Sequence, residues 1–259
     1  MYKNIKIVFF SILFLWNTDS VFSQFDYSDF DSLLQKYVSG NNVKYSQFLE
    51  VKEKLDTFTN KMSKVSPNSH PEYFKSKNEQ LAYWINAYNA FILKTVVENY
   101  PIESIKDINF IGFTIWLNKN LIGGEEISFK SLEDDIIRDK FNDPRIHFAI
   151  NCASFSCPPL KNRAYFPEIL DKQLDESTRA FINDKNNFRI DEDQGILYLS
   201  SIFDWYDDDF LDWLYKNENI EEPDMLDYIK LYYDGQIKEE YYSFDIEYYD
   251  YNWQLNDIP

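Results

Sequence analysis

Hydrophobic residues recur at helical spacing along most of the chain. The clearest pattern covers residues 78–100, which are apolar on nearly every side and end at Pro101. A helix of this kind is buried on most of its faces. Further amphipathic patterns predict helices over residues 25–38, 46–65, 128–138, 166–183, 204–215 and 223–232.

Extended segments are short and few. Residues 187–190 and 196–200 flank a group of acidic residues and Gly195, which predicts a β-hairpin. Weaker patterns predict a hairpin formed by residues 113–116 and 120–122, with another short strand near residues 126–127.

One apolar run has a special position because it leads into the residues that can carry chemistry. Residues 146–150 follow Asp143 and Pro144 and predict a buried strand that ends in a loop. Helices thus alternate with short extended segments. We therefore expect an α+β fold: a helix-rich single domain, residues 24–259, with a small, mostly antiparallel sheet.

The first 23 residues have the pattern of an export signal. Lys3 and Lys6 flank the start of an apolar run over residues 5–16, and cleavage is expected near Ser23. An uncleaved N-terminal anchor is the alternative, and a lipoprotein anchor is excluded because the segment holds no cysteine. We expect a periplasmic or secreted protein with no integral membrane segment after cleavage.

The chain is strongly acidic, with a formal net charge of −18. Residues 204–250 alone contain 16 Asp and Glu against 3 Lys. Such a surface repels nucleic acid and anionic lipid, so neither is an expected partner. A solvated acidic face explains the pattern, and binding of divalent cations is the alternative.

Residues 145–160 hold both cysteines of the chain and one of its two histidines. Cys152, Cys157 and His147 have three interpretations. A zinc site is disfavoured because the spacing supplies only three soft ligands and no close Cys pair, so no metal or cofactor is expected. The thiols are otherwise a structural pair or a catalytic pair, in which a histidine activates a thiolate.

The catalytic interpretation requires a turn in the chain. His147 and Cys152 are five residues apart and would point to opposite faces of an unbroken strand, so they meet only if the chain bends near Asn151. Backbone N–H groups of Ala153 and Ser154 could then form an oxyanion hole. Asn151 and Ser154 could orient the imidazole or a substrate carbonyl.

Two further groups lie on predicted helices. Asn86 and Asn89 are three residues apart in the apolar helix, and a buried amide must be satisfied. They either tie loops to the core or line a site. Glu133 could orient the imidazole, and Arg145 is expected to form a bidentate pair with a carboxylate.

Several long motifs, in order, resemble the domain of unknown function 547 family over residues 25–257. They are AYWINAYNA (82–90), DPRIHFAINCAS (143–154), CPPL (157–160), LSSIFDWY (199–206) and YNWQLN (251–256). The resemblance implies an exported bacterial member of a family without a settled activity. One departure is Asp134, where family members often have histidine after the glutamate.

A more distant likeness is to the papain and transglutaminase-like superfamily, in which a cysteine opens a buried helix and a histidine follows on a strand. Here the helix has Asn86 and Asn89 and no cysteine, so a direct transfer of roles implies an inactive protein. Activity would then require Cys152 to act from its loop.

The leading hypothesis is a thiol-dependent hydrolase or acyl transferase acting on a small molecule or peptide. Its catalytic residues would be Cys152 as nucleophile and His147 as base, with Asn86, Asn89 and Glu133 as orienting groups. Its binding residues would be Arg145, Asn151, Ser154 and Cys157.

Two other hypotheses stay open. One is a non-catalytic binding or scaffolding domain with a structural Cys/His loop. The other is thiol–disulfide exchange, which the C-x4-C spacing disfavours.

Two geometric predictions follow from these hypotheses. Cys152 and Cys157 should not be joined by a disulfide, because the strand fixes the first and Pro158-Pro159 stiffens the second. His147 should lie within about 8 Å of Asn86 or Asn89 in one shared polar pocket, since buried polar groups need partners.

Overall fold

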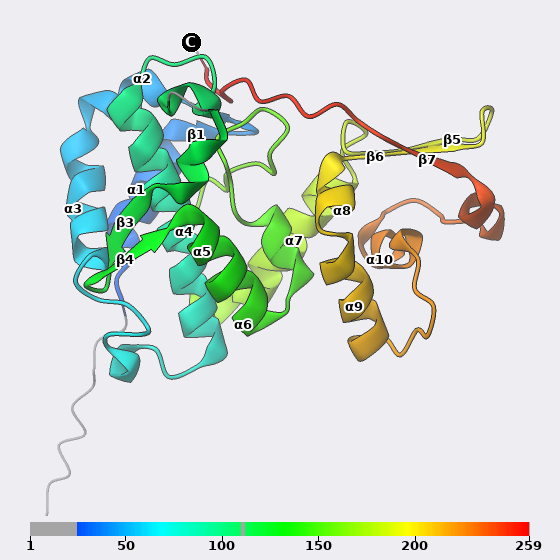
Figure 1. Cartoon of the computed structure of the whole chain (residues 1–259), viewed down its shortest axis with the longest axis horizontal. Coiled ribbons are helices and arrows are strands. Elements are labelled where there is room, and N and C mark those ends of the chain that lie inside the picture. The colour runs from blue at the N-terminus through cyan, green and yellow to red at the C-terminus, as the bar shows by residue number, and fades with distance from the viewer. Residues whose placement is uncertain (1–24, 110–111, 259) are drawn as a thin grey trace, which may run out of the picture.

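The computed structural model describes residues 25–109 and 112–258. The predicted signal peptide, residues 1–23, lies outside these ranges and stays a prediction. The described chain is helix-rich α+β, with small sheets at its margins, as expected (Figure 1). Its buried hydrophobic side chains form two adjoining cores.

The first core surrounds the long helix α4, Lys77–Asn99, which agrees with the predicted helix. A capping box fixes its start: the Ser76 hydroxyl accepts from the Glu79 N–H, and the Glu79 carboxylate accepts from the Ser76 N–H. The helices packed around it are α1 (Ser28–Tyr37), α2 (Tyr45–Glu50) and α3 (Lys52–Met62). The predicted helix 46–65 is therefore two helices, separated at Val51.

A hairpin and a bent helix cover one side of α4. Strands β3 (Lys119–Ile122) and β4 (Glu125–Ser128) pair antiparallel around Gly123 and Gly124, both at positive φ. The predicted strand over residues 113–116 is wrong, because Gly112–Leu117 is a 3-10 helix. Ser128 caps the following helix as predicted, which runs through α5 (Phe129–Ser131), a π-helical turn (Leu132–Arg138) and α6 (Asp139–Phe141).

The predicted strand over residues 146–150 is also wrong. Pro144–Phe148 is a 3-10 helix, and the Asp143 carboxylate caps it by accepting from the Arg145 N–H at 3.1 Å. Pro144 is at the first helical position, where its missing N–H costs nothing. A short buried apolar run has no hydrophobic period that distinguishes a strand from a helix. Among the described residues, no strand pairs with it.

The second core follows in the chain. A 3-10 turn (Pro167–Ile169) leads into α7 (Leu170–Ile182), which contributes to both cores. The predicted hairpin is confirmed as β5 (Phe188–Asp191) and β6 (Ile196–Leu199), with Phe188 opposite Leu199. Helices α8 (Ser201–Trp205), α9 (Asp207–Asn217) and α10 (Met225–Tyr232) complete this core.

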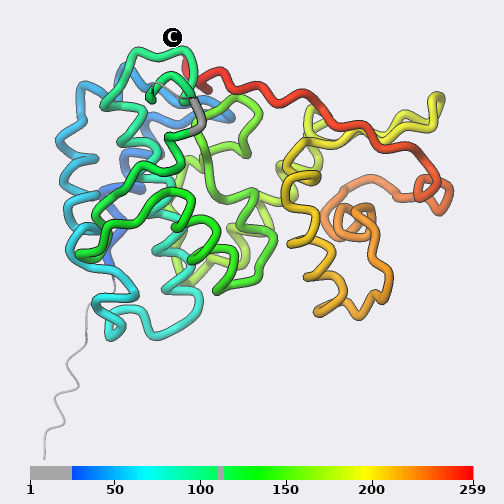
Figure 2. The backbone as a smooth tube through the Cα atoms, in the orientation of Figure 1, coloured from blue at the N-terminus to red at the C-terminus, as the bar shows by residue number. Residues whose placement is uncertain are grey.

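Near its end the chain crosses back from the second core to the first. Strand β7 (Asp245–Tyr248) pairs parallel with β6, and the last residues then run along the first core to the helices near the start of the chain (Figures 1 and 2). There the Asn256 side chain accepts from the Tyr45 hydroxyl at 2.7 Å, and the Val43 N–H donates to the Asn256 carbonyl at 2.8 Å. The last residues of the chain thus link the two cores, in addition to helix α7.

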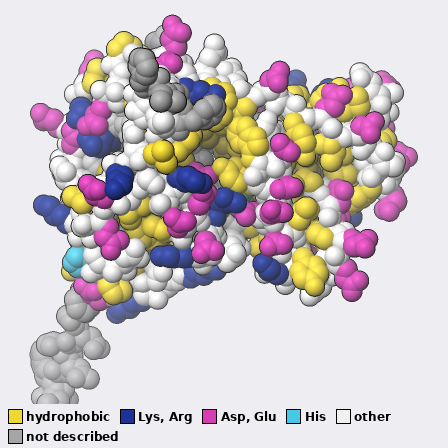
Figure 3. Space-filling view, viewed as in Figure 1, with side chains coloured by type: hydrophobic (Ala, Val, Ile, Leu, Met, Phe, Trp, Pro, Cys, Tyr) yellow, Lys and Arg dark blue, Asp and Glu magenta, His cyan; other side chains and the backbone are white. Residues whose placement is uncertain are grey.

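The surface is consistent with the acidic composition. On the face in Figure 3, Asp and Glu side chains are frequent over the second core and Lys and Arg are few there. Within the described residues, no helix combines the length and the apolar character that a membrane span requires.

Candidate functional site

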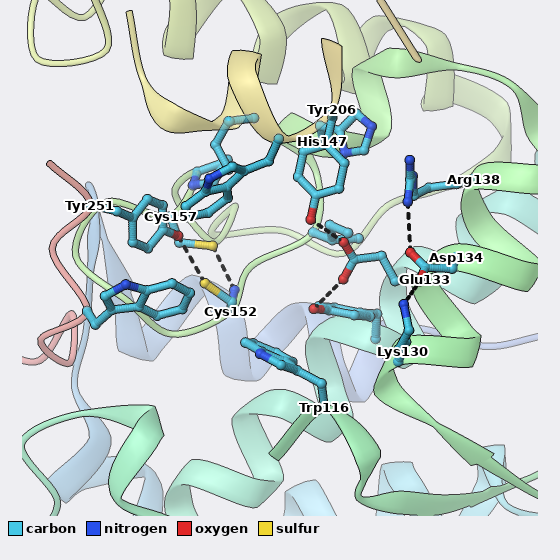
Figure 4. A pocket seen from close by; sticks show the side chains of 16 residues that line it. Trp116, Lys130, Glu133, Asp134, Arg138, His147, Cys152, Cys157, Tyr206 and Tyr251 are labelled. Atoms are coloured by element: carbon cyan, nitrogen blue, oxygen red, sulfur yellow. Dashed lines mark hydrogen bonds and ion pairs between the residues drawn. The ribbon is translucent and has the colours of Figure 1, made fainter. Parts of the chain in front are cut away.

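A cavity of about 440 Å³ lies where the two cores meet. This volume falls in the range of roughly 300–1,000 Å³ that small-molecule sites occupy. Figure 4 shows Cys152, Cys157 and Tyr251 on one side of it and Glu133, Asp134 and Arg138 on the other. Its wall includes six aromatic residues, which are Tyr88, Trp116, Trp205, Tyr206, Tyr251 and Trp253.

The loop that carries Cys152 is fixed from below by the buried helix. The Asn89 side chain donates to the Ala149 carbonyl at 2.9 Å and accepts from the Asn151 N–H at 2.8 Å. The Asn151 side chain in turn donates to the Pro158 carbonyl and accepts from the Ala153 N–H. The loop therefore bends directly after Asn151, where the sequence required a turn.

Ala153 has a positive φ of 63°. An L-residue with a Cβ in this left-handed region costs about 1–2 kcal/mol, and such strain is concentrated at functional sites. The Ala153 N–H is already donated to Asn151, so the oxyanion hole predicted from Ala153 and Ser154 is not available in that form. The Ser154 hydroxyl lies 3.4 Å from the Cys152 sulfur.

Cys152 is partly exposed at the cavity wall, and both cysteines are free. The Cys152 N–H donates to the Cys157 sulfur at 2.8 Å, and the Tyr251 hydroxyl lies 3.2 Å from the Cys152 sulfur. Burial acts to raise the pKa of Cys152, but hydrogen bonds from Cys157, Ser154 and Tyr251 outweigh it and lower this pKa to about 7. Burial raises the pKa of Cys157 well above its ordinary value, so Cys152 is the more acidic thiol.

Tyr251 packs against two tryptophans of the cavity wall, Trp205 and Trp253. Its ring centroid is 4.8 Å from that of Trp205 and 4.5 Å from that of Trp253. Burial raises the pKa of the Tyr251 hydroxyl well above its ordinary value, so it stays protonated and can donate to the sulfur.

Glu133 faces the cavity between two tyrosines. Its carboxylate accepts from the Tyr88 hydroxyl at 2.9 Å and from the Tyr206 hydroxyl at 2.6 Å. Lys130 and Arg138, on the same bent helix, both pair with Asp134. Glu133 therefore lines the cavity, but its partners are hydroxyl groups and not the imidazole that the sequence led us to expect.

His147 lines the cavity but is only 3% exposed. Its Nε2 lies 2.7 Å from the Asp209 carboxylate, and its ring stacks on Tyr206 with centroids 4.0 Å apart. Burial acts to raise the pKa of Asp209, but His147 and Arg138 hold it well below its usual range. No hydrogen bond joins His147 to Cys152 within the described part of the chain.

The helix amides have structural partners. Asn86 donates to the Tyr165 carbonyl at 2.8 Å and accepts from the Tyr165 N–H at 2.9 Å, and Asn89 makes the backbone bonds described above. Backbone groups satisfy the amides and Asp209 lies beside the imidazole, so no hydrogen bond joins His147 to either amide within the described residues. The predicted separation of about 8 Å stays a prediction. The alternative that the amides tie loops to the core describes them correctly.

Arg145 forms the bidentate pair that the sequence predicted. Its Nε and one terminal nitrogen donate to the two oxygens of Asp143 at 2.9 and 2.7 Å, and the other terminal nitrogen donates to Asp175 at 2.7 Å. Arg145 does not line the cavity, and neither do Asn151 and Ser154, whereas Cys157 does.

The aromatic lining is what the sequence reasoning missed. Tyr206, Tyr251 and Trp253 lie in the motifs 199–206 and 251–256, so a signal was present. Nothing in those motifs indicated that they meet the Cys152 loop. Among the described residues, no group of His, Cys, Asp and Glu side chains could hold a metal ion.

The fold and site define a helix-rich α+β protein with an acidic thiol in an aromatic cavity. Residues 72–182 match the family model described as "Protein of unknown function, DUF547", so this segment carries the domain of that family. The match includes Glu133, His147 and both cysteines but ends before Tyr206 and Tyr251. The comparisons found no match among curated proteins or solved structures.

Proposed function

We propose that this protein is a thiol-dependent acyl hydrolase or acyl transferase with Cys152 as its nucleophile. The observation that carries the proposal is the position of the Cys152 sulfur. It lies at the wall of a cavity large enough for a substrate, with the Tyr251 hydroxyl 3.2 Å away and a strained Ala153 directly after it. A cysteine that is held only for packing needs neither feature.

The reaction proceeds in two steps. In the first, the Cys152 thiolate attacks the carbonyl carbon of an ester or amide, and a C–S bond forms while the carbonyl π pair moves to oxygen. Collapse of this intermediate breaks the bond to the alcohol or amine, which leaves with a proton from water. In the second, water or an acceptor hydroxyl or amine attacks the thioester, and Cys152 is released with the acyl group transferred.

The thiolate does not depend on a neighbouring imidazole. With a pKa of about 7, roughly half of Cys152 is ionised at neutral pH. The sequence suggested His147 as the general base; in this proposal it is a positioning residue instead. His147, held by Asp209, supports the ring of Tyr206, whose hydroxyl donates to Glu133.

The test combines labelling with turnover. Iodoacetamide should label Cys152 selectively near pH 7, and p-nitrophenyl acetate should give a burst of nitrophenol with an acetyl group mapped to Cys152. Cys152→Ala should abolish the burst. Phe155→Ala is the matched control and should retain it, because Phe155 is an exposed residue of the same loop that does not line the cavity. A burst that survives Cys152→Ala would refute the proposal.

A second candidate is a non-catalytic binding domain. It is favoured by the position of His147, which is buried against Tyr206 and bonded to Asp209, so no base touches the thiol. Under this candidate the cavity binds a ligand that Cys152→Ala does not affect. In either case we propose that the protein acts in the periplasm or outside the cell, on the basis of the signal-like residues 1–23.

A further inference from the structure

Acyl transfer at Cys152 needs a hydrogen-bond donor for the substrate's carbonyl oxygen, which becomes negatively charged when the thiolate attacks. Backbone N–H groups often supply it, but five of the six from Cys152 to Cys157 already have acceptors within the protein. Those of residues 152, 153, 155, 156 and 157 donate to the Cys157 sulfur, the Asn151 side chain and the carbonyls of Gln254, Asn252 and Ser154, respectively. These five groups are therefore not free to bind an oxyanion.

The sixth N–H belongs to Ser154, which contacts the sulfur from inside the protein. Ser154 is 0% exposed and does not line the cavity, although its hydroxyl lies 3.4 Å from the Cys152 sulfur. It can stabilise the thiolate, but a substrate reaches the sulfur from the cavity side. A donor for the oxyanion must therefore come from a side chain of the cavity wall.

Most polar donors of that wall are engaged by carboxylates. They are the Tyr88 and Tyr206 hydroxyls on Glu133, the Lys130 and Arg138 cations on Asp134, and the His147 imidazole on Asp209. Among the described residues that line the cavity, Tyr251 is the one that places a hydroxyl within hydrogen-bonding distance of the Cys152 sulfur.

The position of Tyr251 suits the transition state. Its hydroxyl lies 3.2 Å from the Cys152 sulfur, on the cavity side (Figure 4). The oxyanion forms two bonds away from that sulfur, so a donor beside the sulfur can also reach the oxyanion. Burial raises the pKa of Tyr251 well above its ordinary value, so this hydroxyl keeps its proton at neutral pH. The hydroxyl also interacts with Cys157, so it is not bound to a single acceptor.

We infer that Tyr251 is a catalytic residue, whose hydroxyl donates to the Cys152 thiolate in the resting site and to the substrate's oxyanion during the reaction. This inference rests on the proposed acyl transfer at Cys152 and adds the group that stabilises its intermediate. As the C–S bond forms, the carbonyl π pair moves to oxygen, and the hydrogen bond from Tyr251 moves from sulfur to oxygen without proton transfer. Charged oxygen is a stronger acceptor than sulfur, so the interaction is strongest where the barrier lies.

The test compares two reactions of the same thiolate on the full chain. Iodoacetamide is attacked at a saturated carbon, so no oxyanion forms. Acetylation by p-nitrophenyl acetate passes through an oxyanion. The alkylation profile between pH 5 and 10 gives the ionised fraction of Cys152 in each variant, and the acetylation rate is divided by that fraction.

Two substitutions at the sulfur separate the roles. Tyr251→Phe should slow acetylation per thiolate about a hundredfold, while alkylation per thiolate stays the same. Ser154→Ala removes the other hydroxyl at this sulfur, from the side away from the substrate, and should slow both reactions at pH 7 by the same factor. Tyr215→Phe is the matched control, because Tyr215 is 58% exposed on α9 and does not line the cavity. It should leave both rates unchanged.

Equal slowing of the two reactions by Tyr251→Phe would overturn the inference, because Tyr251 would then act on the thiol alone. If Tyr251→Phe does not fold, the native chain is compared with free N-acetylcysteine on p-nitrophenyl acetate and its thionoester, in which sulfur replaces the carbonyl oxygen. Sulfur is a weak acceptor, so the native chain should prefer the oxygen ester roughly tenfold more than the free thiol does. The same preference in both would overturn the inference.

The proposed function fails separately, when p-nitrophenyl acetate leaves no acetyl group on Cys152 of the native chain. That result would remove the role of Tyr251 as well. A chain whose Cys152 is acetylated equally fast per thiolate with and without the Tyr251 hydroxyl keeps the proposed function and loses this catalytic residue.

Discussion

Cys157 should control the acidity of Cys152, and its replacement gives a direct test of the site. The pKa of Cys152 is lowered from 9.0 to about 7, although burial acts in the opposite direction. A difference of this size corresponds to about 3 kcal/mol in favour of the thiolate. Three residues supply it, and Cys157 is the largest contributor, followed by Ser154 and Tyr251.

Removal of the largest of these contributions should raise the pKa of Cys152 by about one unit, to about 8, which corresponds to roughly 1 kcal/mol. At pH 7 the ionised fraction then falls from about one half to roughly one tenth, so alkylation slows about fivefold. Because the pKa of Cys152 rises, the slowing of alkylation should approach tenfold below about pH 6, and it should disappear above about pH 9.

The assay is the rate of iodoacetamide alkylation between pH 5 and 10, followed by intact mass. Cys157→Ala removes the contact and should give the higher pKa. Cys157→Ser keeps a hydrogen-bond donor of similar size and should hold the pKa of Cys152 near 7. If the two variants give the same profile as the native chain, Cys157 does not stabilise the thiolate, and the account of the site's electrostatics is wrong.

Two further predictions concern stability. Arg145→Lys keeps the charge but loses the bidentate bond to Asp143, and should lower the free energy of unfolding by about 1–3 kcal/mol. An unchanged melting temperature would show that the bidentate pair does not stabilise the fold. Asn89→Ala leaves the Ala149 carbonyl and the Asn151 N–H buried without a partner, and should cost about 2–6 kcal/mol in urea unfolding. An Asn89→Ala chain of native stability would show that water replaces both bonds.

Local patterns predicted the elements whose signal lies within one segment. The observed bounds of helix α4 lie within one residue of the predicted bounds at each end. The apolar pattern, the Ser76 cap and Pro101 all favour the same helix. The prediction of a strand over residues 146–150 failed because this segment lacks such local signals. It is short and apolar, so only tertiary contacts decide its conformation, and Pro144 with the Asp143 cap favour a 3-10 turn.

The candidate site was predictable only in part. Cys152, Cys157 and His147 share one short stretch of sequence, and all three line the cavity. The partners that set their properties are far away along the chain: Tyr251 is 99 residues from Cys152, and Asp209 is 62 residues from His147. Such pairings follow from the packing of the two cores, and no local pattern contains them.

The return of the chain to the first core explains why the site needs the whole described fold. Asn89 sets the backbone of the Cys152 loop from inside the first core, whereas the second core supplies Tyr206. Tyr251 reaches the sulfur only because the segment after β7 crosses between the cores and is fixed by Asn256. The acidity of Cys152 is therefore a property of the assembled molecule, and separating the cores should return this thiol to ordinary reactivity before either core unfolds.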